Sequence, residues 1–233
     1  TLMMKKILLA STSTLFGQGY LEYLLEELQS FFAEISTITF IPYARPGGIS
    51  HEAYTQLVQT AFSKIDKKVV GLHSFKAPLE GLAQAEAIFT GGGNTFLLVQ
   101  QLHELGLMNV LKEKIVQGTP YLGTSAGSNI AGPSMRTTND MPIVYPPSFD
   151  TLGVVDFNLN PHYLDPDAGS KHKGETRETR IREFHSFNNT PVIGLREGNY
   201  IMIDGNQKTL KGEGTARIFE QGKKPYESRN IPF

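Results

Sequence analysis

The sequence predicts an α/β fold, a sandwich in which a parallel sheet is covered by helices on both faces. Short apolar runs alternate with amphipathic stretches through the first half of the chain. The amphipathic stretches are long enough to be helical crossovers, which join parallel strands through right-handed connections. The chain has 233 residues, with no internal repeat and no linker-like segment. It therefore predicts a single domain over residues 1–233, large enough to bury a substantial core.

The elements of the first half follow from the spacing of the apolar residues. Strands are expected at Lys6–Ala10, Ile38–Tyr43, Val69–Leu72, Ala87–Thr90 and Tyr121–Gly123. Helices are expected between them, at Tyr20–Phe32, Glu52–Ile65, Leu79–Ala85, Thr95–Leu105 and Met108–Gln117.

The second half of the chain is richer in turn-forming residues. Loops with short strands are expected between Gly132 and Pro161, followed by a helix over Glu175–Phe187 that turns Ile181, Phe184 and Phe187 toward the core. Four short strands complete the chain, with a hairpin turn around Gly205: Val192–Leu195, Tyr200–Ile203, Lys208–Leu210 and Ala216–Phe219.

Composition excludes several classes of function. The formal net charge is −1 and the pI is about 6.6, so nothing favours binding to nucleic acid or to an anionic membrane. No run of eighteen apolar residues occurs, and the apolar run after Lys6 is too short for a secretory signal. The absence of cysteine excludes disulfides, thiolate metal sites and a cysteine nucleophile, and it suits the reducing cytoplasm, where we expect the protein to act.

Residues 123–127 have the form Gly-x-Ser-x-Gly, with Ser125 at the centre. An apolar strand precedes this motif and small, helix-compatible residues follow it, as in a nucleophile elbow. The elbow exposes the serine hydroxyl above the sheet edge, and the N–H of Ala126 can then donate to a developing oxyanion. The alternative interpretation is an ordinary turn between a strand and a helix.

A second turn, Gly91-Gly92-Gly93-Asn94, also follows an apolar strand and opens a helix. It lacks the lysine of a phosphate-binding P-loop. Its geometry predicts a backbone N–H that contributes to the oxyanion hole. An N-cap role for Asn94 is compatible with that prediction.

A serine nucleophile needs a general base, and the chain has six histidines. His51, His103 and His185 lie in or beside amphipathic stretches and are expected at the surface. His73, which follows a strand, is an alternative base. His162 is the stronger candidate, because it ends a strand-like run stopped by proline, and active-site groups of α/β sheets gather at strand ends. Aspartates near His162 lack a fourth metal ligand, so no metal site is predicted.

Six blocks of sequence resemble the peptidase E family of aspartyl dipeptidases, which belongs to the same clan as the cyanophycinases. They occur in the family's order: GGGNTF (91–96), GTSAG (123–127), RTTNDMPIV (136–144), NPH (160–162), HKGETR (172–177) and EGN (197–199). Thr124 departs from a family pattern that has a bulky aromatic residue before the serine, which concerns the shape of the pocket and not the nucleophile.

The resemblance implies a fold related to class I glutamine amidotransferases and a cofactor-free serine mechanism. Ser125 matches the nucleophile, His162 the general base and Glu197 the acid that orients the imidazole. Gly93 and Ala126 match the oxyanion-hole amides, and Arg177 matches the residue that grips the substrate's aspartate side chain.

Two of these assignments have rivals. Asp140 is the rival acid, with a supporting role in the active-site loop as its other interpretation. Arg177 could instead belong to a solvated helix face held by ion pairs, because Glu178 and Arg182 are four residues apart. If Arg177 is not the selecting cation, Lys173, His172 and Arg136 are the next candidates.

The function predicted from the sequence is hydrolysis of Asp-X dipeptides through an acyl-enzyme on Ser125. A cyanophycinase-like peptidase and a non-catalytic, amidotransferase-like binding module are the alternatives. The expected partner is a small peptide substrate, and a homodimer is left open.

Overall fold

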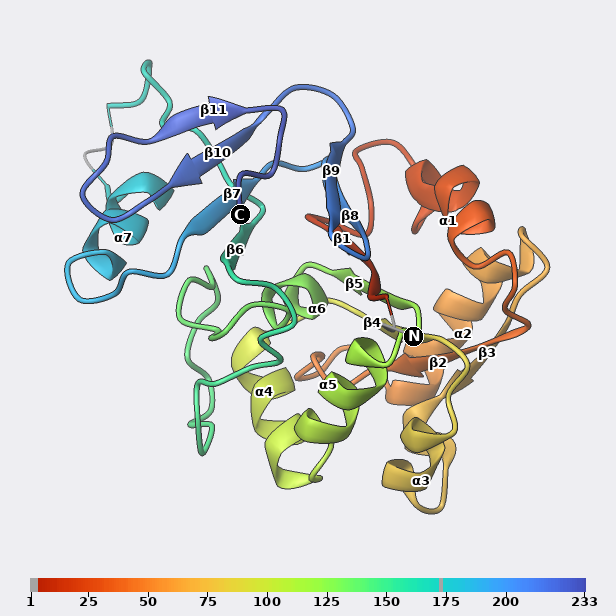
Figure 1. The fold of residues 1–233 in the computed structure, drawn as a ribbon. Coiled ribbons are helices and arrows are strands. Elements are labelled where there is room, and N and C mark those ends of the chain that lie inside the picture. The colour runs from red at the N-terminus through yellow and green to blue at the C-terminus, as the bar shows by residue number, and fades with distance from the viewer. Residues whose placement is uncertain (1–3, 172–173) are drawn as a thin grey trace.

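The structure is a computed structural model that describes residues 4–171 and 174–233. Its strands form two sheets (Figure 1). The larger sheet has seven strands in the order β3 (Lys68–Gly71), β2 (Thr37–Ile41), β4 (Ile88–Thr90), β5 (Tyr121–Thr124), β1 (Lys6–Ala10), β8 (Tyr200–Asp204) and β9 (Gln207–Lys211). The first five of these are parallel, whereas β8 and β9 run antiparallel at the edge.

Helices cover both faces of the seven-stranded sheet, as the sequence predicted. They are α1 (Leu25–Phe31), α2 (His51–Ser63), α3 (Pro78–Ala83), α4 (Thr95–Glu104) and α5 (Met108–Val116). Alternate residues of β1 enter different cores: Leu8 packs with the apolar residues of α1 and α2, and Ile7 packs with those of α3 to α5. This alternation is what the pleat of a sheet buried on both sides requires. The predicted α/β/α sandwich is therefore confirmed.

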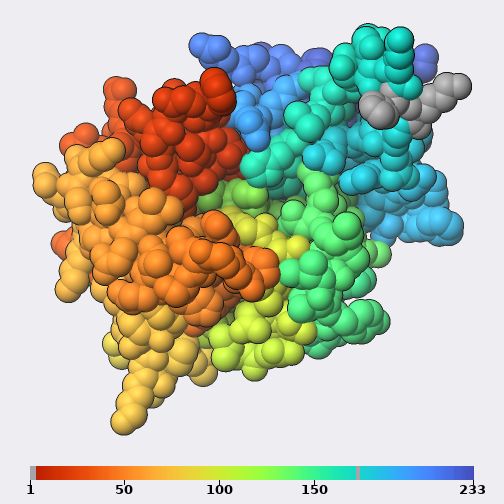
Figure 2. Space-filling view, turned by 180° about the vertical axis from the view of Figure 1, so that it is seen from behind, coloured from red at the N-terminus to blue at the C-terminus, as the bar shows by residue number. Residues whose placement is uncertain are grey.

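The smaller sheet was not foreseen as a separate unit. It has four strands in the order β11 (Tyr226–Ser228), β10 (Ala216–Phe219), β7 (Val192–Leu195) and β6 (Asn158–Pro161), of which β6 and β7 are parallel. One face joins the main core through Ile193 and Leu195, and the other packs Val192 against Ile181 of helix α7 (Arg177–Phe184). Figure 2 shows the teal and blue second half of the chain on one side of the molecule and the red to yellow first part on the other.

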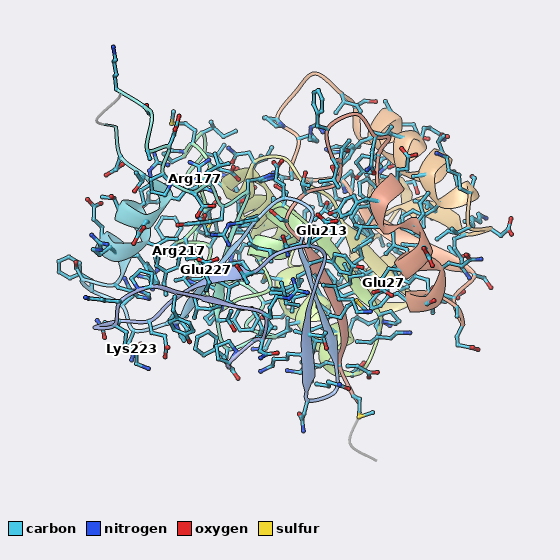
Figure 3. The ribbon with its side chains drawn as sticks, turned by 90° about the horizontal axis from the view of Figure 1, so that it is seen from above. Glu27, Arg177, Glu213, Arg217, Lys223 and Glu227 are labelled. Atoms are coloured by element: carbon cyan, nitrogen blue, oxygen red, sulfur yellow. The ribbon has the colours of Figure 1, made fainter. Side chains whose placement is uncertain are left out.

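Ion pairs connect residues in the outer part of the four-stranded sheet. Arg196 binds Asp165 with both ends of its guanidinium, at 2.8 and 2.9 Å, and reaches Glu227 at 2.7 Å. Arg217 lies beside Glu227 (Figure 3), with its Nη1 3.1 Å from the carboxylate. The sheet therefore depends on charge pairing as well as on apolar contacts.

Element boundaries differ from the predictions mainly at helix ends. The first predicted helix begins with a 3₁₀ turn over Glu22–Leu24 before α1. Helix α7 begins after the N-cap Thr176, whose side chain accepts from the N–H of Thr179, and it ends at Phe184. Phe187 lies beyond that end and is 92% exposed, so the prediction that it faces the core was wrong. The hairpin at Gly205 is confirmed, with Asp204 paired to Gln207.

Within the described residues, none of the helices is long and apolar enough to cross a membrane.

Candidate active site

Ser125 lies on a sharp turn between β5 and the short helix α6 (Ala126–Asn129). Its backbone has φ 52° and ψ −111°, a region that residues other than glycine rarely adopt. The flanking glycines make the turn sterically feasible. A Cβ on Gly123 would lie 2.4 Å from the carbonyl oxygen of Gly127, and a Cβ on Gly127 would lie 2.0 Å from that of Thr90. The sequence motif is thus a strained elbow and not an ordinary turn.

His162 and Glu197 come from neighbouring strand ends of the four-stranded sheet. The parallel pairing of β6 with β7 sets Pro161 beside Leu195, so the residues that follow these strands emerge together. His162 Nε2 lies 2.8 Å from Ser125 Oγ, and its Nδ1 lies 2.9 Å from Glu197 Oε1. The structure therefore joins the three predicted residues in one hydrogen-bonded chain that crosses between the two sheets.

The other histidines have separate partners. His73 Nε2 lies 3.0 Å from Glu52, and the His51 ring packs edge-on against His73. His103 bonds the carbonyl of Asp150. His185 was expected at the surface, but it is only 9% exposed and its Nε2 bonds the carbonyl of Thr190 at 2.8 Å. It follows the last turn of α7, and the tertiary fold covers it.

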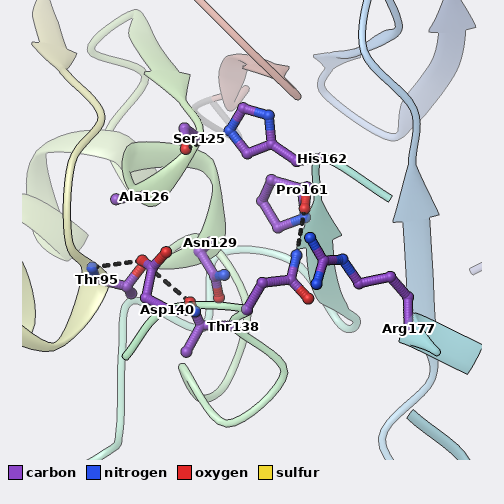
Figure 4. Close-up of a pocket in the computed structure, with 10 residues that line it drawn as sticks. Thr95, Ser125, Ala126, Asn129, Thr138, Asp140, Pro161, His162 and Arg177 are labelled. Atoms are coloured by element: carbon purple, nitrogen blue, oxygen red, sulfur yellow. Dashed lines mark hydrogen bonds between the residues drawn. The ribbon is translucent and has the colours of Figure 1, made fainter. Parts of the chain in front are cut away.

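Asp140 has a different environment from Glu197. Its Oδ2 accepts hydrogen bonds from the N–H of Thr95 at 2.7 Å and from the Thr95 hydroxyl at 2.6 Å. The carboxylate therefore binds the N-terminal turn of α4, where negative charge is favoured. Its Oδ1 has no hydrogen-bond partner among the described residues, and Asp140 is one of the residues that line the cavity in front of Ser125 (Figure 4).

The two predicted oxyanion-hole amides flank the nucleophile. Gly93 has φ 147°, and a Cβ there would lie 2.3 Å from the carbonyl oxygen of Ala44, so the position requires glycine. A Cβ on the adjacent Gly92 would lie 3.0 Å from the Ser125 Cβ, which shows how close this turn runs to the nucleophile. In the part of the chain that the structure describes, neither the Gly93 nor the Ala126 N–H donates to a protein acceptor. Asn94 also acts as the N-cap of α4.

A cavity of about 220 Å³ opens beside the hydrogen-bonded chain. Its walls come from both halves of the molecule (Figure 4): Thr95, Ser125, Ala126, Asn129, Thr138, Asn139, Asp140, Pro161, His162 and Arg177. Sequence reasoning singled out five of these residues individually, whereas Thr138 and Asn139 appeared only inside a motif block. Asn129 was missed, although it lies four residues after Ser125 on the elbow helix; it is 1% exposed, and its Oδ1 has no hydrogen-bond partner in the part of the chain that the structure describes.

Arg177, at the first position of α7, faces this cavity (Figure 4). Its Nε is buried without a hydrogen-bond partner, and among the described residues no carboxylate forms an ion pair with it. Burial lowers the pKa of the guanidinium, and the nearby Arg180 lowers it further, against the opposing effect of Asp140. The predicted ion pair between Glu178 and Arg182 forms on the same helix, with Glu178 Oε1 3.2 Å from Arg182 Nη2, and Arg177 does not take part in it.

Of the other candidates for the selecting cation, Arg136 lies over the Phe184 ring at 5.9 Å and lines a neighbouring cavity of about 400 Å³. His172 and Lys173 lie outside the described residues.

A model of peptidase family S51 matches residues 7–211, a span that contains the whole hydrogen-bonded chain and the cavity. The chain belongs to peptidase family S51. Among its relatives, the peptidase E of Streptomyces coelicolor is 49% identical, over 95% of this chain and 90% of that protein. A Drosophila melanogaster protein named "Probable alpha-aspartyl dipeptidase" is 46% identical, over 93% of this chain and 90% of that protein.

The fold agrees with that of a solved peptidase structure. The crystal structure of a peptidase from an acI-B1 Actinobacterium superposes with a TM-score of 0.71, at 17% identity, over 98% of this chain and 96% of that one. At that identity the likeness concerns the fold alone. It extends beyond the S51 match to include the outer strands of the four-stranded sheet.

Proposed function

We propose that this S51 peptidase hydrolyses dipeptides with an N-terminal L-aspartate through an acyl-enzyme on Ser125. One observation carries the proposal: the Ser125–His162–Glu197 chain borders a small cavity lined by Arg177, whose guanidinium has no ion-pair partner among the described residues. The names of the S. coelicolor and D. melanogaster relatives support the same activity.

The chemistry follows from the positions of the atoms. As Ser125 Oγ attacks the peptide carbonyl, His162 Nε2 takes the hydroxyl proton, and Glu197 stabilises the imidazolium through Nδ1. The N–H groups of Gly93 and Ala126 then donate to the oxyanion. Collapse of the tetrahedral intermediate breaks the peptide bond, and Nε2 returns the proton to the leaving amine. Water, activated by the same imidazole, hydrolyses the aspartyl ester and regenerates the serine.

Arg177 supplies the selection for aspartate in this proposal. The substrate side chain is anionic at neutral pH, and enclosing it without a partner costs several kcal/mol. A charge-assisted contact from the guanidinium offsets that cost, and such contacts contribute about 1.5–3 kcal/mol.

Asp140, on the wall of the cavity opposite Arg177, accounts for a preference for substrates with a free N-terminus. The substrate's α-ammonium needs an acceptor, and Asp140 lines the cavity with a carboxylate whose Oδ2 alone is bonded to Thr95. Asp140 then binds substrate and helix α4 with its two oxygens. The cavity of about 220 Å³ suits one small residue on the acyl side of the cleaved bond.

The decisive experiment compares Asp-Leu, Asn-Leu, Glu-Leu and β-Asp-Arg as substrates of the wild type and of Arg177→Met. Asp and Asn differ little in shape, so their ratio isolates the charge. We expect kcat/KM for Asp-Leu to fall about 10- to 100-fold in the variant, with Asn-Leu affected far less. Arg182→Met is the matched control, because Arg182 lies on the same helix with 70% of its side chain exposed.

The outcomes separate the alternatives. An unchanged Asp-to-Asn ratio would assign the selecting cation to Arg136, His172 or Lys173. Preferential cleavage of β-Asp-Arg would favour a cyanophycinase-like activity. A chain that neither cleaves any of these peptides nor reacts with a serine-directed phosphonate would be a binding module. The cytoplasmic location and the homodimer stay predictions, to be tested by cell fractionation and by size-exclusion chromatography with light scattering.

A further inference from the structure

Ser11 lies directly after β1, and its side chain is completely buried. Its hydroxyl donates to the carbonyl of Leu195 at 2.8 Å and accepts from the N–H of His162 at 2.8 Å. Its own N–H donates to the carbonyl of Asn199 at 3.1 Å. Ser11 thus binds the backbone on both sides of the Glu197 turn and the backbone of His162 as well.

The preceding residue binds the nucleophile. The carbonyl of Ala10 accepts from the N–H of Ser125 at 3.1 Å and from the hydroxyl of Ser128 at 2.7 Å. Two adjacent residues at the end of β1 are therefore bonded to the backbone around all three members of the Ser125–His162–Glu197 chain.

This connection crosses between the two sheets. β1 belongs to the seven-stranded sheet, whereas His162 follows β6 and the Glu197 turn follows β7 in the four-stranded sheet. His162 has φ 54°, a conformation that is unfavourable for a residue other than glycine, and its N–H donates to the Ser11 hydroxyl. The Ser11 hydroxyl satisfies that N–H in the strained conformation, from which the imidazole reaches Ser125.

We propose that Ser11 is a positioning residue. Its hydroxyl holds His162 and the Glu197 turn, which follow strands of the four-stranded sheet, in the correct position relative to Ser125, which follows a strand of the seven-stranded sheet. The inference rests on the proposed function. Ser11 is not part of the cavity wall, so it acts through His162 and Glu197 and not on the substrate. An error of about 1 Å in the placement of a reacting group can cost about a hundredfold in rate, so a backbone contact can govern turnover.

The test is Ser11→Ala, measured by steady-state kinetics on Asp-Leu and by the rate at which a fluorophosphonate labels Ser125. We expect kcat and the labelling rate to fall about 10- to 100-fold, with KM within about twofold of the wild type. Ser11→Cys keeps the shape with a weak hydrogen-bonding group, and it should show the same loss of kcat if the alanine variant does not fold.

Ser134→Ala is the matched control. Ser134 is also a buried serine, 4% exposed, whose hydroxyl accepts from Asn158 Nδ2 at 3.1 Å, without contact to Ser125, His162 or Glu197. It should lose stability to a similar extent and keep its kcat. A folded Ser11 variant with kcat within twofold of the wild type would overturn the proposal, as would an equal loss of kcat in Ser134→Ala.

A crystal structure of the Ser11 variant gives a readout that does not depend on activity. The His162 Nε2 to Ser125 Oγ distance, 2.8 Å in the unaltered chain, should lengthen beyond hydrogen-bonding range. An unchanged distance would contradict the positioning role. If the wild type cleaves no peptide and its Ser125 is not labelled, the proposed function fails, while this distance still decides the role of Ser11.

Discussion

The seven-stranded sheet and the four-stranded sheet hold their parts of the site by different means. Around Ser125 the backbone is fixed by close steric contact: strands buried on both faces, and glycines at 123 and 127 with no room for a Cβ. Around His162 and Glu197 the segments that follow β6 and β7 are held by polar contacts from Ser11 and Arg196. The turn at the nucleophile thus depends mainly on packing, beside the hydrogen bonds to the Ala10 carbonyl, whereas the base and acid depend more on hydrogen bonds and ion pairs.

This difference has a physical consequence. Packing in a core responds steeply to added volume, while the partly exposed ion pairs of Arg196 respond to charge, pH and salt. The two parts of the site should therefore fail under different perturbations.

The largest effect on activity is expected at the nucleophile. Ser125→Ala removes the attacking oxygen without adding volume, so the chain should fold normally and lose kcat by about 10⁴-fold or more. Asp-Leu hydrolysis measures the loss, and circular dichroism with a thermal melt is the control for folding. Activity near the wild-type level would refute a nucleophilic role for Ser125.

The next effect distinguishes Glu197 from Asp140. Glu197→Gln keeps the shape but presents the wrong partner to His162 Nδ1, and by analogy with other triads kcat should fall about 10³- to 10⁴-fold. Asp140→Asn is the comparison, since Asp140 Oδ2 contacts Thr95 and not the imidazole. It should raise KM for Asp-Leu more than Glu197→Gln does. A kcat loss in Asp140→Asn larger than that in Glu197→Gln would reverse the two assignments.

Stability should respond most at Gly127. Gly127→Ala places a methyl group 2.0 Å from the Thr90 carbonyl oxygen, and we expect a loss of about 3 kcal/mol or more in the free energy of unfolding. Chemical denaturation measures it. Gly174→Ala is the control, because a Cβ there meets no atom within 4 Å. A stable Gly127→Ala protein would contradict the steric account of the elbow.

Arg196 allows the corresponding test of the polar contacts around His162 and Glu197. Arg196→Met keeps an apolar stem but removes the guanidinium, which lies over the Tyr163 ring and contacts Asp165, Glu227 and the Thr215 carbonyl. Because Arg196 adjoins Glu197, kcat should fall about tenfold with little change in KM.

The matched control for that variant lies in the other sheet. Lys211→Met breaks the ion pair between Lys211 and Glu27, 2.7 Å apart, and should leave kcat unchanged. Equal effects of the two substitutions on kcat would show that kcat depends on ion pairs in both sheets alike.

The smallest expected effect is the dependence of the four-stranded sheet's stability on pH. The hydrogen bond from Arg196 lowers the pKa of Asp165; burial alone would raise the pKa of Glu227, but bonds from Arg196, Thr215 and Arg217 lower it overall. Both folded-state values lie below the unfolded ones, so the stabilisation is complete above pH ~4–4.5 and is lost as the pH falls through the folded pKa values. Amide exchange between about pH 3 and 5 should show β7, β10 and β11 losing protection before β1 and β5. Simultaneous loss in both sheets would contradict the comparison.

Local features of the sequence determined much of this protein. The alternation of apolar runs and amphipathic stretches predicted the layered sandwich, because strand and helix periods are properties of neighbouring residues. The elbow at Ser125 was predictable for a similar reason: small residues at 123 and 127 are needed wherever a strand turns this sharply into a helix.

Only the tertiary structure decided the rest. The four-stranded sheet, the burial of His185, the exposure of Phe187 and the lack of a partner for Arg177 among the described residues depend on which distant segments meet. Ser11 is the clearest case, since its hydroxyl bonds residues 151 and 184 positions away along the chain. Nothing in the residues around Ser11 distinguishes it from any serine at a strand end, because a hydrogen bond between distant backbones leaves no periodic trace in the sequence.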